Sequence, residues 1–226
     1  MAIGRYAVAG AVGLALLVML FGEYESDSDD FGGDEPKSSA SAAAKGPVLD
    51  RDRTRALLPP RDVLKGWTSV GVATADDLTR FPGHQCSGTA APVCAKAVSY
   101  GKSLHSKVDG GRIMFSVYGY QSAKAARSAF PHLWKLGHLP LKPPLTRVKI
   151  GGSLGEEYRA QRGLTNLDDP GATVQMRVGT TLLLVEHGGA GSRQLDEERL
   201  SQLAGMLAER SRQAQKGEKP SAKLRG

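Results

Sequence analysis

Residues 172–187, ATVQMRVGTTLLLVEH, decide the fold of this chain. Apolar and polar residues alternate over 174–178, which is typical of a strand with one buried face and one face in water. Residues 182–185 are continuously apolar, which is typical of a central strand that is covered on both faces. Gly179 and the threonines after it link the two runs, so this stretch predicts an antiparallel hairpin.

A second clear strand is predicted at 112–120, RIMFSVYGY, where Ile113, Phe115 and Val117 share one face. Further strands are expected at 67–73, 95–100, 146–150 and 156–162, and helices before Pro59, from Pro60, after Ser122 and over 196–212. Several strands follow one another before each helix, which indicates an α+β domain. In an α/β domain a helix would follow almost every strand. We therefore expect a single α+β domain with a mostly antiparallel mixed sheet packed with helices.

The N-terminus holds an uncharged apolar run, residues 6–22, directly after the single basic residue Arg5. Its 17 residues lie at the lower limit for a membrane-spanning helix, and no small-x-small cleavage site follows it. We predict a signal anchor over 1–22; a cleaved signal peptide, which would give a secreted protein, is the alternative. The positive-inside rule places Arg5 in the cytoplasm, so the domain is expected outside the cell membrane as part of a single-pass protein.

Composition divides the rest of the chain into three parts. Residues 23–48 are acidic and then rich in serine and alanine, which predicts a disordered linker. Residues 49–213 form the expected domain, and residues 214–226 are expected to be a basic, disordered tail. Residues 1–44 carry a net charge of −5 within an overall charge of +7, so the remaining residues carry +12.

The basic charge of the body bears on its partners. A basic domain outside the cell fits an anionic lipid, an acidic envelope polymer or an acidic protein partner. Nucleic acid is not expected, because the predicted compartment argues against it. The sequence has neither a phosphate-binding glycine loop nor a cluster of histidines with metal-ligand spacing, so no cofactor and no metal are expected.

A resemblance to a known family follows from the order of several segments. These are LLPPRDV with the following GW, the cysteine-bearing loop, a strand before SAKAA, VGTTLLLVE, and the final LSQLAGMLAERS. Together, over about residues 55–212, they resemble the extracellular sensor domains of PknH-type bacterial receptor kinases and related actinobacterial lipoproteins. The resemblance implies a mixed antiparallel sheet with helices around a cleft, and ligand binding or sensing without known catalysis. This chain departs from it in having two cysteines where the receptor domain has two cysteine pairs, and we expect no kinase before the predicted anchor.

The two cysteines, Cys86 and Cys94, lie in the stretch HQCSGTAAPVC at 84–94. Zinc sites use closer cysteine pairs and four ligands, and a thioredoxin-like centre needs C-x-x-C. In an exported domain, two cysteines that close a short loop predict a structural disulfide, with metal or redox chemistry as the alternatives.

One motif points to an enzyme. Gly151 to Gly155 matches G-x-S-x-G, and Asp168 and His187 follow in the order found in serine hydrolases. The motif requires a long helix after the serine, and the residues after Gly155 are typical of a strand instead. Ser153, His187 and Asp168 are therefore kept as an alternative catalytic set, and a glycine turn is the preferred interpretation.

Candidate ligand-binding residues come from the strands and the middle helix: Tyr118, Tyr120, Trp134, Glu186 and His187. The aromatic side chains fit either core packing or the lining of a concave face. Glu186 and His187 end a strand, where side chains can face a groove. Glu156 and Glu157, on a neighbouring predicted strand, are candidate carboxylate partners for acid–base chemistry. We predict a membrane-anchored, extracytoplasmic, noncatalytic binding or sensor domain for a cell-envelope component. A small serine hydrolase and a scaffold protein of an envelope complex are the alternatives.

Overall fold

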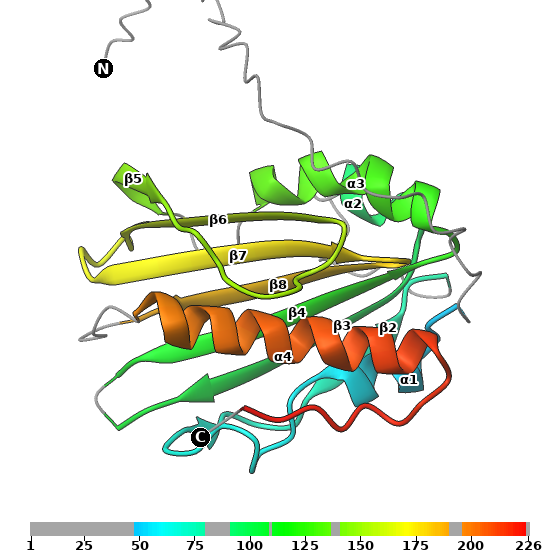
Figure 1. The fold of residues 1–226 in the computed structure, drawn as a ribbon, viewed down its shortest axis with the longest axis horizontal. Coiled ribbons are helices and arrows are strands. Elements are labelled where there is room, and N and C mark those ends of the chain that lie inside the picture. Colours follow the sequence, from blue (N-terminus) through cyan, green and yellow to red (C-terminus); the bar gives the residue numbers. More distant parts are fainter. Residues whose placement is uncertain (1–47, 80–90, 109, 137–140, 190–195, 225–226) are drawn as a thin grey trace, which may run out of the picture. The chain divides into compact units, whose positions relative to one another are not determined.

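The computed structural model describes residues 48–79, 91–108, 110–136, 141–189 and 196–224 (Figure 1). The predicted signal anchor and nearly all of the predicted linker lie outside the described residues. Within the described ranges, no helix is both long and apolar enough to cross a membrane.

In the described ranges the domain is one eight-stranded sheet with four helices, which confirms the predicted α+β class. The strands follow the order β1-β3-β4-β8-β7-β6-β5, with β2 also paired to β3, and every pair is antiparallel. The strands are β1 (Thr68–Ser69), β2 (Thr74–Asp77), β3 (Ala97–Ser106), β4 (Arg112–Tyr120), β5 (Lys142–Arg147), β6 (Glu157–Leu164), β7 (Pro170–Val178) and β8 (Thr181–Gly188). The helices are α1 (Arg51–Leu57), α2 (Ala91–Cys94), α3 (Ala123–Leu136) and α4 (Glu197–Gln215).

The predicted hairpin forms the centre of the sheet. Val178 of β7 pairs with Thr181 of β8, so Gly179 and Thr180 alone make the turn. Gly179 adopts a φ of 53°, a left-handed conformation that favours glycine and is required by the tight two-residue hairpin turn. β8 lies between β7 and β4, as expected for its continuously apolar run.

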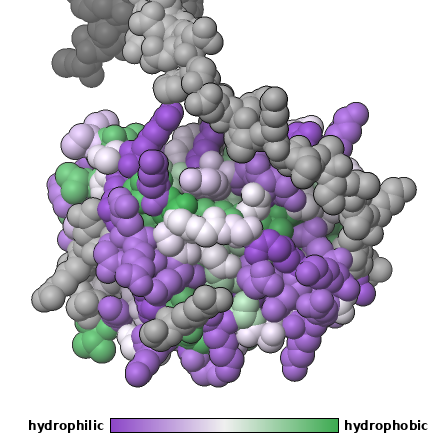
Figure 2. All heavy atoms as spheres, viewed as in Figure 1, coloured by the Kyte–Doolittle hydropathy of each residue, from purple (hydrophilic) through white to green (hydrophobic). Residues whose placement is uncertain are grey.

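Helices cover both faces of the sheet (Figure 1). On one face, α1 and α4 pack on Phe115 and Val117 of β4 and on Leu183 of β8. On the other face, α2 and α3 pack on Tyr118, Tyr120 and Leu182. Figure 2 shows the molecule from the side of α4, where hydrophilic residues cover most of the surface and hydrophobic ones show between them.

The predicted wet face of β7 is wrong. Thr173, Gln175 and Arg177 are buried although they alternate with the apolar residues of the strand. The reason is that α3 contacts β4, β8 and β7 on this side, so β7 is covered on both faces like β8. Polar side chains of β7 therefore lie in the interior, under α3. The candidate site is in this part of the sheet.

One helix prediction also changes. No helix begins at Pro60; residues 60–67 form turns instead, in which the Val63 amide bonds the Pro60 carbonyl and the Trp67 amide bonds the Leu64 carbonyl. Val63 and Leu64 are buried, so these turns carry core residues without helical backbone. In the middle of the chain, α3 continues through Pro131 to Leu136, and the Ser122 hydroxyl accepts from the Ala125 amide at its start, as predicted.

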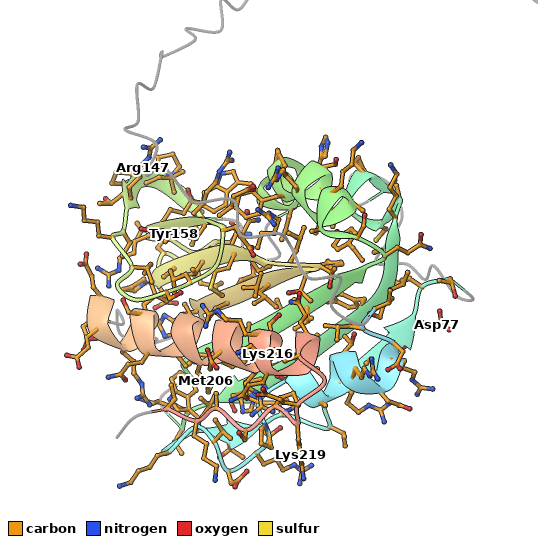
Figure 3. All side chains as sticks on the ribbon, turned by 45° about the vertical axis from the view of Figure 1, so that its right-hand side comes forward. Asp77, Arg147, Tyr158, Met206, Lys216 and Lys219 are labelled. Atoms are coloured by element: carbon orange, nitrogen blue, oxygen red, sulfur yellow. The ribbon has the colours of Figure 1, made fainter. Side chains whose placement is uncertain are left out.

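The tail that was predicted to be disordered makes defined contacts over residues 216–224 in the structure. Gly217, with a φ of 80°, ends α4 in a left-handed conformation that favours glycine. The Gly217 amide donates to the Ala214 carbonyl, and the Glu218 amide donates to the Gln213 carbonyl. The chain then returns along α4: the Gln213 Oε1 accepts from the Ser221 and Ala222 amides, and Ala222 and Leu224 pack on the core. Figure 3 labels Lys216 at the end of α4 and Lys219 on the returning segment.

Arg210 connects this segment to the start of the domain. Its buried guanidinium donates to the carbonyls of Ala56, Leu57 and Leu58 at the end of α1, and to that of Ala222. Arg210 thus joins α1, α4 and the C-terminal segment, and burial lowers the pKa of its guanidinium.

Candidate functional site

The predicted ligand-binding residues fall on two faces. Tyr118, Tyr120 and Glu186 point toward the α3 side of the sheet, and Trp134 belongs to α3 itself. His187 follows Glu186 on β8, so its side chain points to the opposite face, where its ring lies 6.3 Å from that of Trp67. The structure therefore places four of the five on the α3 side of the sheet and His187 on the opposite side, and Tyr120 and Glu186 lie toward opposite ends of the paired strands β4 and β8.

Tyr118 and Tyr120 are core residues. Both are fully buried under α3, and the Tyr120 hydroxyl donates to the Val93 carbonyl at 2.7 Å. The sequence left core packing and the lining of a concave face open for the aromatic residues, and Tyr120 is a core residue packed under α3. Tyr118 lies nearer the polar residues described next.

Polar residues surround Leu184 on the α3 face of the central strands. Ser116 on β4 and Gln175 on β7 are the two direct cross-strand partners of Leu184. The next row along the same face holds Glu186, which is paired with Thr173. We name Ser116, Thr173, Gln175 and Glu186 the polar floor; it spans two strand spacings, or about 10 Å.

The polar floor contains buried atoms without partners. Thr173 is 4% exposed and Gln175 is 0% exposed, and their Oγ1, Oε1 and Nε2 atoms make no hydrogen bond with any described residue. Leaving such a group buried and unpaired costs about 1–3 kcal/mol. Folded proteins pair the great majority of buried polar atoms with protein groups or ordered water, so the Gln175 amide has hydrogen-bonding capacity left for a water molecule or a ligand.

Two tyrosines border the polar floor on its β3 side. Tyr100 and Tyr118 are a cross-strand pair with ring centroids 4.7 Å apart. Burial raises the pKa of both phenols, and the negative charge of Glu186 raises both pKa values further. The Ser116 hydroxyl lowers the pKa of Tyr100, but less than burial raises it. Both phenols therefore stay protonated at neutral pH and act as neutral hydrogen-bonding groups.

Exposed cations flank the three residues Ser116, Leu184 and Gln175 on their row of the sheet. Arg159 on β6 is directly opposite Gln175, and Lys102 on β3 is directly opposite Ser116. The Arg159 guanidinium lies over two aromatic rings of α3, 5.6 Å from Phe130 and 6.0 Å from Trp134. Neither cation forms a salt bridge with a residue in the described part of the chain.

Glu156 and Glu157 do not join Glu186 and His187 as an acid–base set. Glu156 and Glu157 instead form salt bridges of 3.3 and 3.1 Å with the buried Arg177, and Glu156 also accepts from the Gly179 amide. Both carboxylates thus neutralise a buried arginine at the hairpin end of β7. Glu186 and His187 lie toward the other end of β8.

The alternative hydrolase set is not assembled either. Ser153 lies in a loop, and its carbonyl and hydroxyl both accept from Arg212 in the last turn of α4. The neighbouring Ser211 is 2.7 Å from the Thr181 hydroxyl, at the first residue of β8. His187 is six residues further along β8, which corresponds to about 20 Å at 3.3 Å per residue.

Asp168 is also remote from Ser153. It lies in the turn between β6 and β7, where its carboxylate forms a 3.0 Å salt bridge with Lys142. Ser153 does line an open hollow of about 670 Å³ beside α4, together with Glu198, Glu209 and Arg212, but no described histidine lines it. The glycine-rich stretch is thus a turn before β6, as preferred from the sequence.

The cysteines and metal sites can be described only in part. Cys94 ends the short helix α2, directly after the buried Val93. Cys86 lies outside the described residues, so the disulfide stays a prediction. No group of three or more histidine, cysteine, aspartate or glutamate side chains in the described ranges is arranged to hold a metal ion.

Comparisons with known proteins give one structural likeness. The fold is similar to the crystal structure of the extracellular domain of PknH from Mycobacterium tuberculosis, with a TM-score of 0.44 and 13% sequence identity. The match covers 72% of this chain and 94% of that one. Neither the scan against protein families nor the search of curated proteins found a match.

Proposed function

We propose that this chain is a noncatalytic binding domain that receives a small ligand at the polar floor. The observation that carries the proposal is the side chain of Gln175, which is fully buried and has neither amide atom paired. The Thr173 hydroxyl, two residues away on the same strand, is also buried and makes no hydrogen bond with a described residue. A ligand with hydrogen-bonding groups would pair these atoms and offset their desolvation cost.

The surroundings of the polar floor support binding rather than catalysis. Its residues stand on central strands whose positions are fixed by neighbours on both sides, which suits a preformed site. Leu184 at its centre offers apolar contact, and Tyr100 and Tyr118 offer aromatic surface. A mostly apolar site with a few well-placed polar groups is the usual character of small-ligand sites.

The proposed setting is the outer side of the cell membrane. It depends on residues 1–22 acting as a signal anchor and on residues 23–48 acting as a tether, as their composition predicts. A component of the cell envelope would be the natural ligand in that compartment. The basic charge of the body fits an anionic envelope component.

A thermal-denaturation screen of the 226-residue chain tests the proposed function. The compounds are monosaccharides, sugar phosphates, amino acids, wall fragments and envelope lipids, each added in excess. A ligand at one hundred times its dissociation constant adds about 2.7 kcal/mol of stability, which is several degrees for a domain of this size. We expect a shift with the natural chain that is lost in Gln175→Leu.

The matched control is Gln202→Leu, the same change on α4, on the opposite face of the sheet. It should keep the ligand-dependent shift. A shift that survives Gln175→Leu would place the binding site elsewhere and contradict the proposal.

A further inference from the structure

The polar floor is built from groups that both donate and accept hydrogen bonds. Ser116 and Thr173 supply hydroxyls, and Gln175 supplies an amide with an acceptor and two donors. The protonated phenols of Tyr100 and Tyr118 border the same area. Groups of this kind match the hydroxyls of a ligand better than a purely apolar or a purely anionic molecule.

Glu186 determines which end of a ligand faces the polar floor. Its side chain is 2% exposed, and it lies in the row next to Gln175, paired with Thr173. A carboxylate accepts hydrogen bonds from ligand hydroxyls and repels a second negative charge close by. The Glu186 carboxylate therefore disfavours an anionic group of the ligand over the centre of the polar floor.

The border of the polar floor has the opposite character. Arg159 is exposed, lies directly opposite Gln175, and has no carboxylate partner within the described ranges. Its guanidinium is held against Phe130 and Trp134 of α3, which leaves less conformational freedom to lose on binding. A guanidinium in a fixed position is well suited to a phosphate or carboxylate group.

From this arrangement we infer that the ligand is a small polyhydroxylated anion. Its hydroxyl groups face Thr173, Gln175 and Glu186, and its phosphate or carboxylate group faces Arg159. The inference rests on the proposed function, because it names the ligand class of that same site. It adds a direction of binding and assigns Arg159 as the residue that recognises the negative charge.

Isothermal titration calorimetry of the 226-residue chain tests the inference with four probes: glucose 6-phosphate, glucuronate, glucose and inorganic phosphate. We expect at least one of the two hydroxylated anions to bind at least tenfold more tightly than both glucose and phosphate. Arg159→Gln should remove that tenfold advantage over glucose. Gln175→Leu should weaken every hydroxylated probe.

The matched control is Arg61→Gln, which makes the same change at an exposed arginine in the turns after α1, on the other face of the sheet. It should leave all affinities unchanged. Equal binding of glucose and its anionic derivatives, or an unchanged preference in Arg159→Gln, would overturn the ligand class while the proposed function stands.

Absence of binding by all four probes would also overturn the ligand class. The proposed function has a separate readout, which is the stability of Gln175→Leu without any probe. If this variant is also less stable than the natural chain, Gln175 is paired in solution and the proposed function itself fails.

Discussion

Arg159 and Gln175 are directly opposite each other in the β6–β7 ladder, yet Arg159 is exposed and Gln175 is fully buried. One residue position thus separates solvent from an unpaired interior amide. The α3 side chains Phe130 and Trp134 stand beside this step and contact the arginine. This border between Arg159 and Gln175 is where we place the entry of a ligand.

Two threonines on neighbouring strands provide a matched test of the polar floor. Thr173 has an unpaired buried hydroxyl, whereas the Thr181 hydroxyl is 2.7 Å from both the Val178 carbonyl and the Ser211 hydroxyl. Valine has nearly the shape of threonine, so each change removes mainly the hydroxyl. Thr173→Val should raise the free energy of unfolding by about 1 kcal/mol, and Thr181→Val should lower it by about 1–2 kcal/mol.

Urea denaturation of both variants measures these changes. The natural chain provides the reference, and the slope of the transition shows whether the unfolded state has changed. Equal losses of stability in the two variants would mean that the Thr173 hydroxyl is paired in solution.

Arg210→Met should be among the most destabilising single changes in the domain. It removes donors from three carbonyls at the end of α1 and from the Ala222 carbonyl, and it leaves buried carbonyls unpaired. We expect a loss of about 3 kcal/mol in chemical denaturation. Arg199→Met, which loses a single hydrogen bond to Gln202, should cost far less. A similar cost for both would contradict the role assigned to Arg210.

His105 makes stability depend on pH. It is fully buried with both ring nitrogens unpaired and its ring 5.7 Å from Phe115, and burial lowers the pKa of its imidazole below 6.5. Below pH 6.5 the unfolded chain therefore binds this proton more readily than the folded one. The free energy of unfolding should fall as pH decreases from about 6.5 to the folded-state pKa, by up to about 1.4 kcal/mol per pH unit.

Denaturation at a series of pH values, compared with His105→Leu, isolates this contribution. The variant cannot take up a proton at position 105, so its profile should be flatter below pH 6.5. Superimposable profiles would show that His105 does not cause the acid sensitivity.

The predicted disulfide between Cys86 and Cys94 has a direct chemical test. Titration of thiols in the unfolded, nonreduced chain should find none, and titration after reduction should find two. By the chain-entropy argument, reduction of so short a loop should lower stability by roughly 2.5 kcal/mol. Two free thiols before reduction would exclude the disulfide.

The C-terminal segment contributes to stability. Deletion of residues 218–226 removes the bonds from Ser221 and Ala222 to Gln213, the Arg210 bond to Ala222, and the packing of Leu224. We expect a loss of about 2 kcal/mol. Lys219→Ala, at an exposed position of the same segment, should have no effect. An undiminished stability after deletion would show that the segment does not pack in solution.

The sequence predicted the hairpin and the order of the larger elements because these depend on local patterns. The alternation in β4, the turn at Gly179 and the apolar face of α4 each appear within a few residues. The site depends on which face α3 covers, and that is a matter of packing between distant segments. The alternation of apolar and polar residues in β7 therefore predicted, wrongly, that Gln175 is exposed to solvent.

One signal in the sequence could have corrected that assignment. The apolar run 182–185 implied that both faces of β8 are covered, so its hairpin partner β7 had to lie partly under the same cover. His187 failed as a member of the site for a related reason. Adjacent strand residues point to opposite faces, so Glu186 and His187 could not both face one ligand.

The stability of Gln175→Leu, measured by urea denaturation with and without glucose 6-phosphate, tests the central claim most directly. If the buried amide is unpaired and kept for a ligand, the variant should be more stable than the natural chain by about 1–2 kcal/mol without the probe. It should then gain nothing from a probe that stabilises the natural chain. A variant that is less stable than the natural chain, and that the probe stabilises equally, would contradict the account.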